Sequence, residues 1–295
     1  MAAVMENGRG IDHLVLAVRD LGAAEAFFAA AGFTLTPRAD HPFGTSNHLA
    51  ILNGNFLELL AITAPAKIPP PTTGHYGIGG QMQDFLARRQ GLAFVVLSSD
   101  DARRDHASFL AAGLPTFEPV DFSRAAGQPD GGQATMSFSI VFVVDPAMPD
   151  APHFVCQQHT PEHFWHPEYQ SHANAAEAIS EVTLIADRPA DLMPYYAGLV
   201  APNAVHAEGE RLLVETPTGR ITVLAPDALA ARFAGIEVPL CAPRPYVAGM
   251  QFRSADLAAT EASLGRGGVD HVKADNALRI APAAAFGAAI EFVEG

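Results

Sequence analysis

The order strand, helix, strand, strand, strand can be followed repeatedly along this 295-residue chain, and such a repeat constrains the fold more than local propensity does. The first copy begins with an apolar, β-branched run at residues 11–18 and continues with an Ala-rich segment at 21–31 that has apolar residues at helical spacing. Asp20 offers an N-cap for this helix, and Gly32 is placed to end it. Three further runs predict strands and complete a βαβββ unit: 33–37, 48–52 and 56–62.

Three more copies of the unit follow, so we expect an α+β fold of four βαβββ modules. They open on strands predicted at 92–97, 179–186 and 248–252. The expected helices span about 101–113, 189–198 and 256–264. The remaining strands are expected near 134–144, 153–158, 211–215, 220–224 and 288–293.

Each module leaves one face of its curved sheet bare, so two modules must pair to bury it. We therefore expect two domains, one over 8–160 from modules 1 and 2 and one over 175–295 from modules 3 and 4. Pairing of module 1 with module 4 stays open as an alternative. Segments rich in Pro or Gly mark the linkers, and residues 77–80 within one of them are interpreted as a flexible loop.

Composition excludes several classes of function. The 18 Lys and Arg against 32 Asp and Glu give a formal charge of −14, which repels nucleic acid and anionic lipid. Neither a secretory signal near the N-terminus nor an apolar run long enough to span a bilayer is evident. The two cysteines, Cys156 and Cys241, suggest no disulfide framework, so we expect a cytoplasmic protein. Together with the charge, these observations predict a protein that acts on a small molecule and binds neither nucleic acid nor membrane.

Three segments of the first module together resemble the glyoxalase-like branch of the vicinal oxygen chelate superfamily: IDHLVLAVRDL at 11–21, GTSN at 44–47 and FLELL at 56–60. The resemblance implies that a divalent metal lies in the sheet cavity and takes ligands from the first and last strands of paired modules. It also implies that His13 holds the first-strand ligand position and Glu58 the last-strand position.

Glu58 and His13 are also notable on physical grounds. A carboxylate between Phe and Leu residues is costly to bury unless it is paired, protonated or bound to a cation, although an edge position open to solvent is an alternative. His13 alternates with Val15 and Ala17, so it shares a face with small apolar residues and could line a cavity. A lone histidine at such a position is more often a satisfied core residue than a ligand.

A metal centre commonly needs three protein ligands, and the sequence offers several candidates for the third. Cys156 falls where Glu58 would have its counterpart in module 2, and Gln158 and His159 lie beside it. We take His159 as the third predicted ligand. If module 1 paired with module 4, the alternatives would be Glu291 on the last strand and Gln251 near the first, and Glu181 holds the position of His13 in module 3.

Polar side chains near the predicted cavity mouth are candidates for substrate binding. Asn47 and His48 follow a Gly-Thr-Ser turn and open a strand, although turn stabilisation also explains the asparagine. His163 and His166 would share one face of a short helix, but no partner at motif spacing accompanies them, so we interpret that segment as a connector.

The leading hypothesis is a glyoxalase-like small-molecule enzyme in which a divalent ion (Zn, Mn, Ni or Fe) polarises substrate oxygens. Glu58 would act as ligand or as proton-transfer base, with His13 as ligand. Lyase, isomerase and dioxygenase reactions all stay open. The alternative is a metal-free protein of the same fold that binds or sequesters a small molecule, and a third hypothesis makes the C-terminal pair of modules a scaffold for a homodimer.

Overall fold

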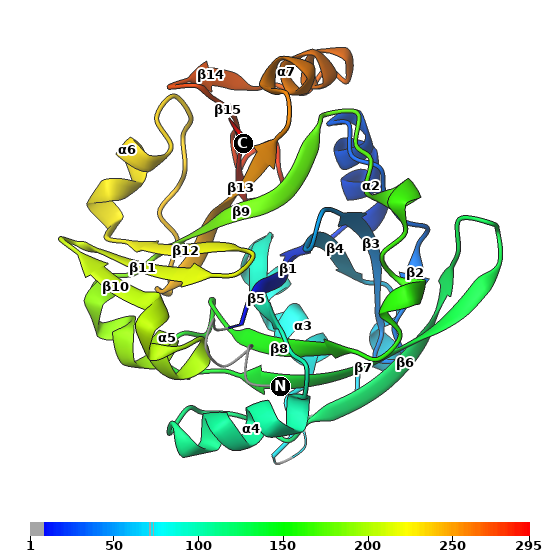
Figure 1. The fold of residues 1–295 in the computed structure, drawn as a ribbon, viewed down its shortest axis with the longest axis vertical. Coiled ribbons are helices and arrows are strands. Elements are labelled where there is room, and N and C mark those ends of the chain that lie inside the picture. The colour runs from blue at the N-terminus through cyan, green and yellow to red at the C-terminus, as the bar shows by residue number, and fades with distance from the viewer. Residues whose placement is uncertain (1–8, 71, 73) are drawn as a thin grey trace.

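The computed structural model describes residues 9–70, 72 and 74–295, and its strands form two sheets of eight strands each (Figure 1). The strand orders are β2-β3-β4-β1-β5-β8-β7-β6 and β10-β11-β12-β9-β13-β16-β15-β14, so the two sheets have the same connectivity. Each sheet joins two consecutive modules, which confirms the α+β fold and the pairing of module 1 with 2 and of 3 with 4. Residue 8, the predicted start of the first domain, and most of the N-terminal segment searched for a signal lie outside the described residues. The two domain ranges stay predictions.

Eight strands from modules 1 and 2 build the first sheet: β1 (Ile11–Ala17), β2 (Ala39–Asp40), β3 (Thr45–Ile51), β4 (Phe56–Ile62), β5 (Gly91–Ser98), β6 (Val120–Gly127), β7 (Gln133–Val143) and β8 (His153–Gln158). Eight strands from modules 3 and 4 build the second: β9 (Ala176–Ile185), β10 (Val205–Glu208), β11 (Arg211–Thr216), β12 (Gly219–Leu224), β13 (Tyr246–Ser254), β14 (Val272–Ala274), β15 (Ala277–Ile280) and β16 (Ala289–Glu294). The α-helices are α2 (Leu21–Ala30), α3 (Ile78–Arg88), α4 (Ala102–Ala111), α5 (Met193–Leu199), α6 (Leu229–Arg232) and α7 (Leu257–Arg266).

Side-chain caps fix where three module helices begin. Asp20, Asp101 and Asp256 precede α2, α4 and α7, and each carboxylate accepts a hydrogen bond from the backbone N–H three residues later. Gly32 follows α2 with a φ of +89°, a conformation that favours glycine. The capping side chains therefore set the residues at which these helices begin.

Two sequence interpretations of the first half are wrong. Residues 33–37 form no strand, and the short β2 takes the edge position instead. Residues 77–80 are not a flexible loop, because α3 begins at Ile78. Its Ile78, Met82 and Phe85 are buried against the first sheet, and this burial outweighs the low helix propensity of the two glycines.

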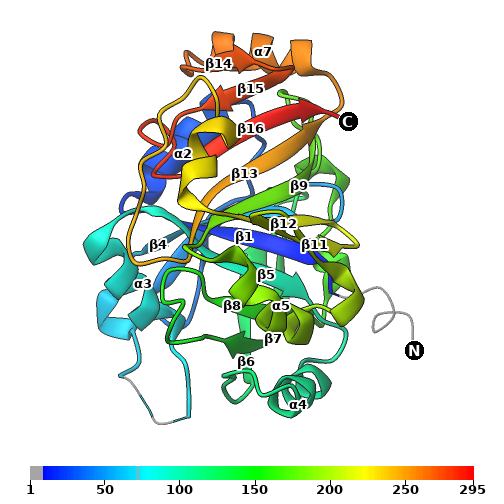
Figure 2. The ribbon, with the colours of Figure 1, turned by 90° about the vertical axis from the view of Figure 1, so that its left-hand side faces the viewer.

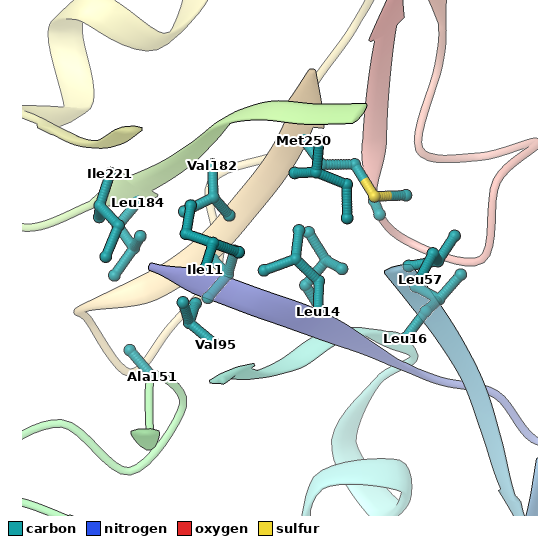
Figure 3. Packing of buried hydrophobic residues seen from close by; sticks show 14 of the residues in the cluster. Ile11, Leu14, Leu16, Leu57, Val95, Ala151, Val182, Leu184, Ile221 and Met250 are labelled. Atoms are coloured by element: carbon teal, nitrogen blue, oxygen red, sulfur yellow. The ribbon is translucent and has the colours of Figure 1, made fainter. Parts of the chain in front are cut away.

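One hydrophobic core lies between the two sheets and draws on both. Figure 2 shows the second sheet above and the first below, with contacts between β13 and β5 and between β4 and β9. Ile11, Leu14 and Leu16 of β1 point toward Val182 of β9 and Met250 of β13 (Figure 3). Helices α2, α4, α5 and α7 add side chains to the same core. Each sheet thus covers the other.

The opposite, concave face of each sheet has its own cluster. In the first sheet this face carries a large apolar group that includes Val15, Phe56, Phe94 and Phe154, whereas the cluster of the second sheet is much smaller. Along β1, His13, Val15 and Ala17 therefore face this side, and Leu14 and Leu16 face the shared core. Within the described part of the chain, no helix is both long and apolar enough to cross a membrane.

Candidate active site in the first sheet

A cavity opens on the concave face of the first sheet. It leaves about 50 Å³ in which the centres of water-sized molecules fit, which is room for a few waters. Most of its wall is apolar and aromatic, and the polar groups are few. The lining residues that carry chemistry are His13, His41, Asn47, Glu58, Arg124 and Cys156.

A β-bulge at the start of β1 shapes the first part of this site. The pairing of β1 with β5 shifts register between Ile11 and His13, so Asp12 is the extra residue. The carboxylate of Asp12 lies 2.7 Å from His13 Nδ1 and accepts a second hydrogen bond, of 3.2 Å, from Gln158 Nε2. A carboxylate can only accept, so Nδ1 donates to Asp12, and in the neutral form of the ring Nε2 presents a lone pair to the cavity. The imidazole also stacks on Phe56 at 4.3 Å between ring centroids.

Glu58 on β4 faces His13 across the cavity. Its side chain is nearly fully buried, with a residue exposure of 7%, so the open edge position considered for it does not apply. Asn47 Nδ2 donates a 2.5 Å hydrogen bond to Oε1, while Oε2 lies 3.7 Å from His13 Nε2. His41 Nε2 lies 3.9 Å from Oε1. The carboxylate is thus held by an amide and flanked by two imidazoles at distances longer than a hydrogen bond.

Burial sets the protonation of three neighbouring groups. Desolvation lowers the pKa of His41 to about 4, although the charge of Glu58 opposes this, so the ring is neutral near pH 7. Desolvation raises the pKa of the Cys156 thiol, and the carboxylates of Asp12 and Glu58 raise it further. Cys156 therefore stays a thiol and is poorly suited to act as a nucleophile or thiolate ligand. Desolvation also lowers the pKa of Arg124, against the attraction of Glu58.

A known protein-family model covers all of the residues that line this site. The model of the glyoxalase-like domain matches residues 11–200, which is more than half of the chain. The chain belongs to the glyoxalase-like family. No functionally curated protein matches it in sequence.

Solved structures share the glyoxalase-like fold at low sequence identity. A hypothetical protein from Staphylococcus aureus matches with a TM-score of 0.70 at 12% identity, over 97% of this chain and 100% of that one. A mutant of 4-hydroxymandelate synthase from Streptomyces coelicolor gives 0.57 at 14% identity, over 98% and 93%. A halotolerant catechol dioxygenase gives 0.53 at 11%, over 98% and 87%. At these identities the likeness shows the fold.

The structure brings together some of the site residues predicted for this glyoxalase-like chain and separates others. His13, Glu58 and Asn47 line one cavity. His48 points to the other face of β3, where Nδ1 lies 2.8 Å from the carbonyl oxygen of Thr36. His159 lines a separate surface hollow, with Nε2 2.8 Å from Ser139 Oγ.

Sequence reasoning missed Arg124, His41 and the role of Asp12. Arg124 lies on β6, a strand that was not predicted because its residues are mostly half-buried or exposed. Its alternation of Val120, Phe122 and Arg124 was the available signal, since Phe122 and Arg124 both line the cavity. Asp12 could not be assigned because the bulge that turns it toward His13 depends on pairing with a distant strand.

The donor set does not complete the metal centre implied by the glyoxalase-like resemblance. His13 Nε2 and Glu58 offer two donors and His41 Nε2 lies 3.9 Å from Glu58 Oε1, but the predicted third ligand, His159, lies outside the cavity. A positive guanidinium, that of Arg124, lines the cavity with Glu58. Among residues 9–70, 72 and 74–295, no group of three or more His, Cys, Asp and Glu side chains is arranged to hold an ion.

Proposed function

We propose that this glyoxalase-like protein is an enzyme that moves a proton on a small molecule bound in the cavity of the first sheet. The observation that carries the proposal is the 3.7 Å gap between His13 Nε2 and Glu58 Oε2. This gap is too long for a direct hydrogen bond, yet both atoms are within reach of one substrate atom placed beside them. Asp12 and Asn47 orient the two groups from behind.

His13 is the proton acceptor in this proposal. A C–H bond next to a substrate carbonyl breaks, its proton bonds to Nε2, and the electron pair passes to the carbonyl oxygen as an enolate. The carboxylates of Asp12 and Glu58 stabilise the imidazolium that forms, as a buried carboxylate does for a catalytic histidine. Return of the proton to a different carbon gives an isomerisation. Of the three reaction types predicted, an isomerase or lyase therefore agrees best with the residues present.

Solvent-deuterium exchange tests this function even while the product is unidentified. Small carbonyl compounds with acidic C–H bonds would be incubated with the protein in D2O and followed by proton NMR. We expect exchange with the wild type and a loss of about 100-fold or more with His13→Gln. The matched control is His206→Gln, because His206 is exposed on β10. Exchange that survives His13→Gln would contradict the assignment of the base.

The divalent ion stays a prediction, and the same assay tests it. Under our proposal, exchange persists after dialysis against a chelator. Loss of exchange on chelation and its recovery with Zn, Mn, Ni or Fe would instead establish the ion as a cofactor, and a third ligand would then have to join His13 and Glu58.

A small-molecule binding protein is the second candidate, favoured by the apolar wall and the narrow volume of the cavity. Binding of a carbonyl compound with no exchange in any member of the panel would support it over the enzyme. The expected cytoplasmic location and the homodimer stay predictions.

A further inference from the structure

Arg124 differs from the other buried arginines of the chain. Arg9, Arg124 and Arg279 are each at most 7% exposed. Arg9 donates to Asp105, and Arg279 donates to Glu291, so both have a carboxylate partner. Among the hydrogen bonds and ion pairs of the described residues, none involves the guanidinium of Arg124. Its one close partner is the ring of Phe138, with the guanidinium carbon 5.7 Å from the ring centroid.

A guanidinium that is only 7% exposed and has no anion partner is costly, because its donors have lost most of their contact with water and gained no equivalent acceptor. Glu58 attracts Arg124 but forms no ion pair with it, and its Oε1 already accepts from Asn47. The carboxylate of Asp12 is engaged by His13 and Gln158. The carboxylates of Glu58 and Asp12 thus have their own donors, and the guanidinium of Arg124 has no hydrogen-bond acceptor among the described residues.

The residues around Arg124 indicate what kind of group the remainder of a bound ligand would have. Arg124 lines both the cavity of His13 and Glu58 and a neighbouring pocket that reaches Thr36 and Tyr169. Its side chain therefore stands where the two spaces meet. Aromatic residues surround this position on both sides, including Phe122, Phe138 and Phe164.

We infer that Arg124 binds the carboxylate of the substrate, which makes the substrate a small monocarboxylate with an apolar, preferably aromatic, body. A planar guanidinium matches a carboxylate in a bidentate geometry, and the phenylalanines provide the apolar contacts. A dianion such as a phosphate monoester fits less well, because the carboxylate of Glu58 lines the same cavity and that of Asp12 lies behind His13. The inference deepens the proposed function, on which it rests for the reacting C–H bond beside His13.

Titration calorimetry with matched acid and amide pairs tests the inference. The probes are pyruvate and phenylacetate, each compared with its neutral amide. We expect the wild type to bind at least one acid and to bind its amide about 10- to 100-fold more weakly, the range for a charged hydrogen bond. Arg124→Gln should lose the same factor, and Arg124→Lys should keep part of it, since lysine retains the charge without the fork.

The control variant is Arg103→Gln, because Arg103 is exposed and paired with Asp121 outside the cavity. Equal binding of acid and amide by the wild type, binding of neither acid, or unchanged affinity in a folded Arg124→Gln protein would overturn the inference. Thermal melts of each variant establish that it is folded.

The outcomes also separate this inference from the proposed function. Acid binding that depends on Arg124, without deuterium exchange, would leave the inference standing and remove the enzyme. Exchange on neutral carbonyl compounds that is lost in His13→Gln but unchanged in Arg124→Gln would support the proposed enzyme and remove the inference about Arg124.

Discussion

The two sheets place different chemistry at the same positions of the same architecture. In the first sheet, His13 pairs with Phe56 on β4 and with Val96 on β5, and Val96 pairs with Phe154 on β8. The row therefore holds one histidine among apolar neighbours. Glu58 lies two residues beyond Phe56 on β4, and the space in front of this row is the cavity.

The equivalent row of the second sheet is polar throughout. Glu181 pairs with Arg220 on β12 and with Gln251 on β13, and Gln251 pairs with Glu291 on β16. Arg232, from the short helix α6, lies 3.2 Å from Glu181 and 2.8 Å from Glu291. Side chains that bond one another fill the place where the first sheet has room for a ligand. The same row thus serves packing in one half and, in our proposal, chemistry in the other.

The largest effect on stability should come from removing Arg232, which bridges the two carboxylates of the second row. Arg232→Met leaves Glu181 and Glu291, which are 6% and 2% exposed, with fewer donors. We expect a loss of about 2–3 kcal/mol in the free energy of unfolding, measured with urea, because each buried carboxylate loses a charged donor and keeps one arginine, Arg220 or Arg279. Arg188→Met is the control, since its ion pair with Asp191 is exposed and should contribute less than about 1 kcal/mol. Similar losses in the two variants would show that Arg232 does not hold the row.

The reverse pattern is expected in the first row. Glu58→Gln keeps a side-chain oxygen that can accept from Asn47, so the free energy of unfolding should change by less than about 1 kcal/mol. Deuterium exchange should nevertheless fall by about 100-fold, because the imidazolium of His13 loses a stabilising charge. Glu215→Gln, an exposed position on β11, is the control. A stability loss as large as that of Arg232→Met, with exchange unaffected, would make Glu58 structural.

Acid should weaken the two halves in different pH ranges. Desolvation, opposed by Glu58 and Asp40, lowers the pKa of His41 from 6.5 to about 4 in the folded state. Its contribution to stability is present above pH 6.5 and is lost as the pH falls toward 4. His41→Gln should therefore flatten the dependence of unfolding free energy on pH in this range. Desolvation gives His153 a pKa of about 3, so part of the slope remains in the variant.

The carboxylate of Glu291 in the second row should respond only to stronger acid. Burial would raise the pKa of Glu291, but Arg232, Gln251 and Arg279 together lower it below 4.5. The stability that this group adds is present above pH 4.5 and is lost below it. Arg232→Met removes the strongest of the influences that lower this pKa, so the pKa of Glu291 should rise and the dependence of unfolding free energy on pH below 4.5 should flatten. Arg188→Met should leave that dependence unaltered, and equal pH dependence in the two variants would contradict the role of Arg232.

The smallest effect is expected at the position that corresponds to Glu58. Thr222 pairs with Thr183 as Glu58 pairs with Val15, and its buried hydroxyl has no hydrogen-bond partner among the described residues. Thr222→Val removes that hydroxyl while nearly conserving volume. We expect a gain of up to about 1 kcal/mol in unfolding free energy, and a clear loss would reveal a partner for the hydroxyl.

Patterns that are local in sequence predicted the fold well. The apolar run at 56–62 became β4, and Asp20 caps α2, because strand alternation and capping depend on near neighbours. The repeat also predicted that the modules pair, and of the pairings left open the structure has module 1 with 2 and module 3 with 4. The short β2, the mostly exposed β6 and the glycine-containing α3 were missed, because they are stabilised by contacts with distant segments.

The candidate site was predictable only in part for the same reason. His13 and Glu58 lie on strands with clear patterns, so their shared face could be inferred. Arg124 and His41 reach the cavity from β6 and from the loop between β2 and β3, and no local pattern places them opposite Glu58. Charge compensation in a cavity is a property of tertiary structure.

The core shared by the two sheets has a consequence for how this chain could evolve. Ile11, Leu14 and Leu16 would be exposed without Val182 and Met250 over them, so the second half is required whatever its concave face does. A duplicated half in this arrangement can exchange its chemical groups for salt bridges and still be retained. Selection on the concave face of each sheet is thereby uncoupled from selection on the face that forms the shared core. A module can therefore lose its catalytic residues and still be retained for its contribution to that core.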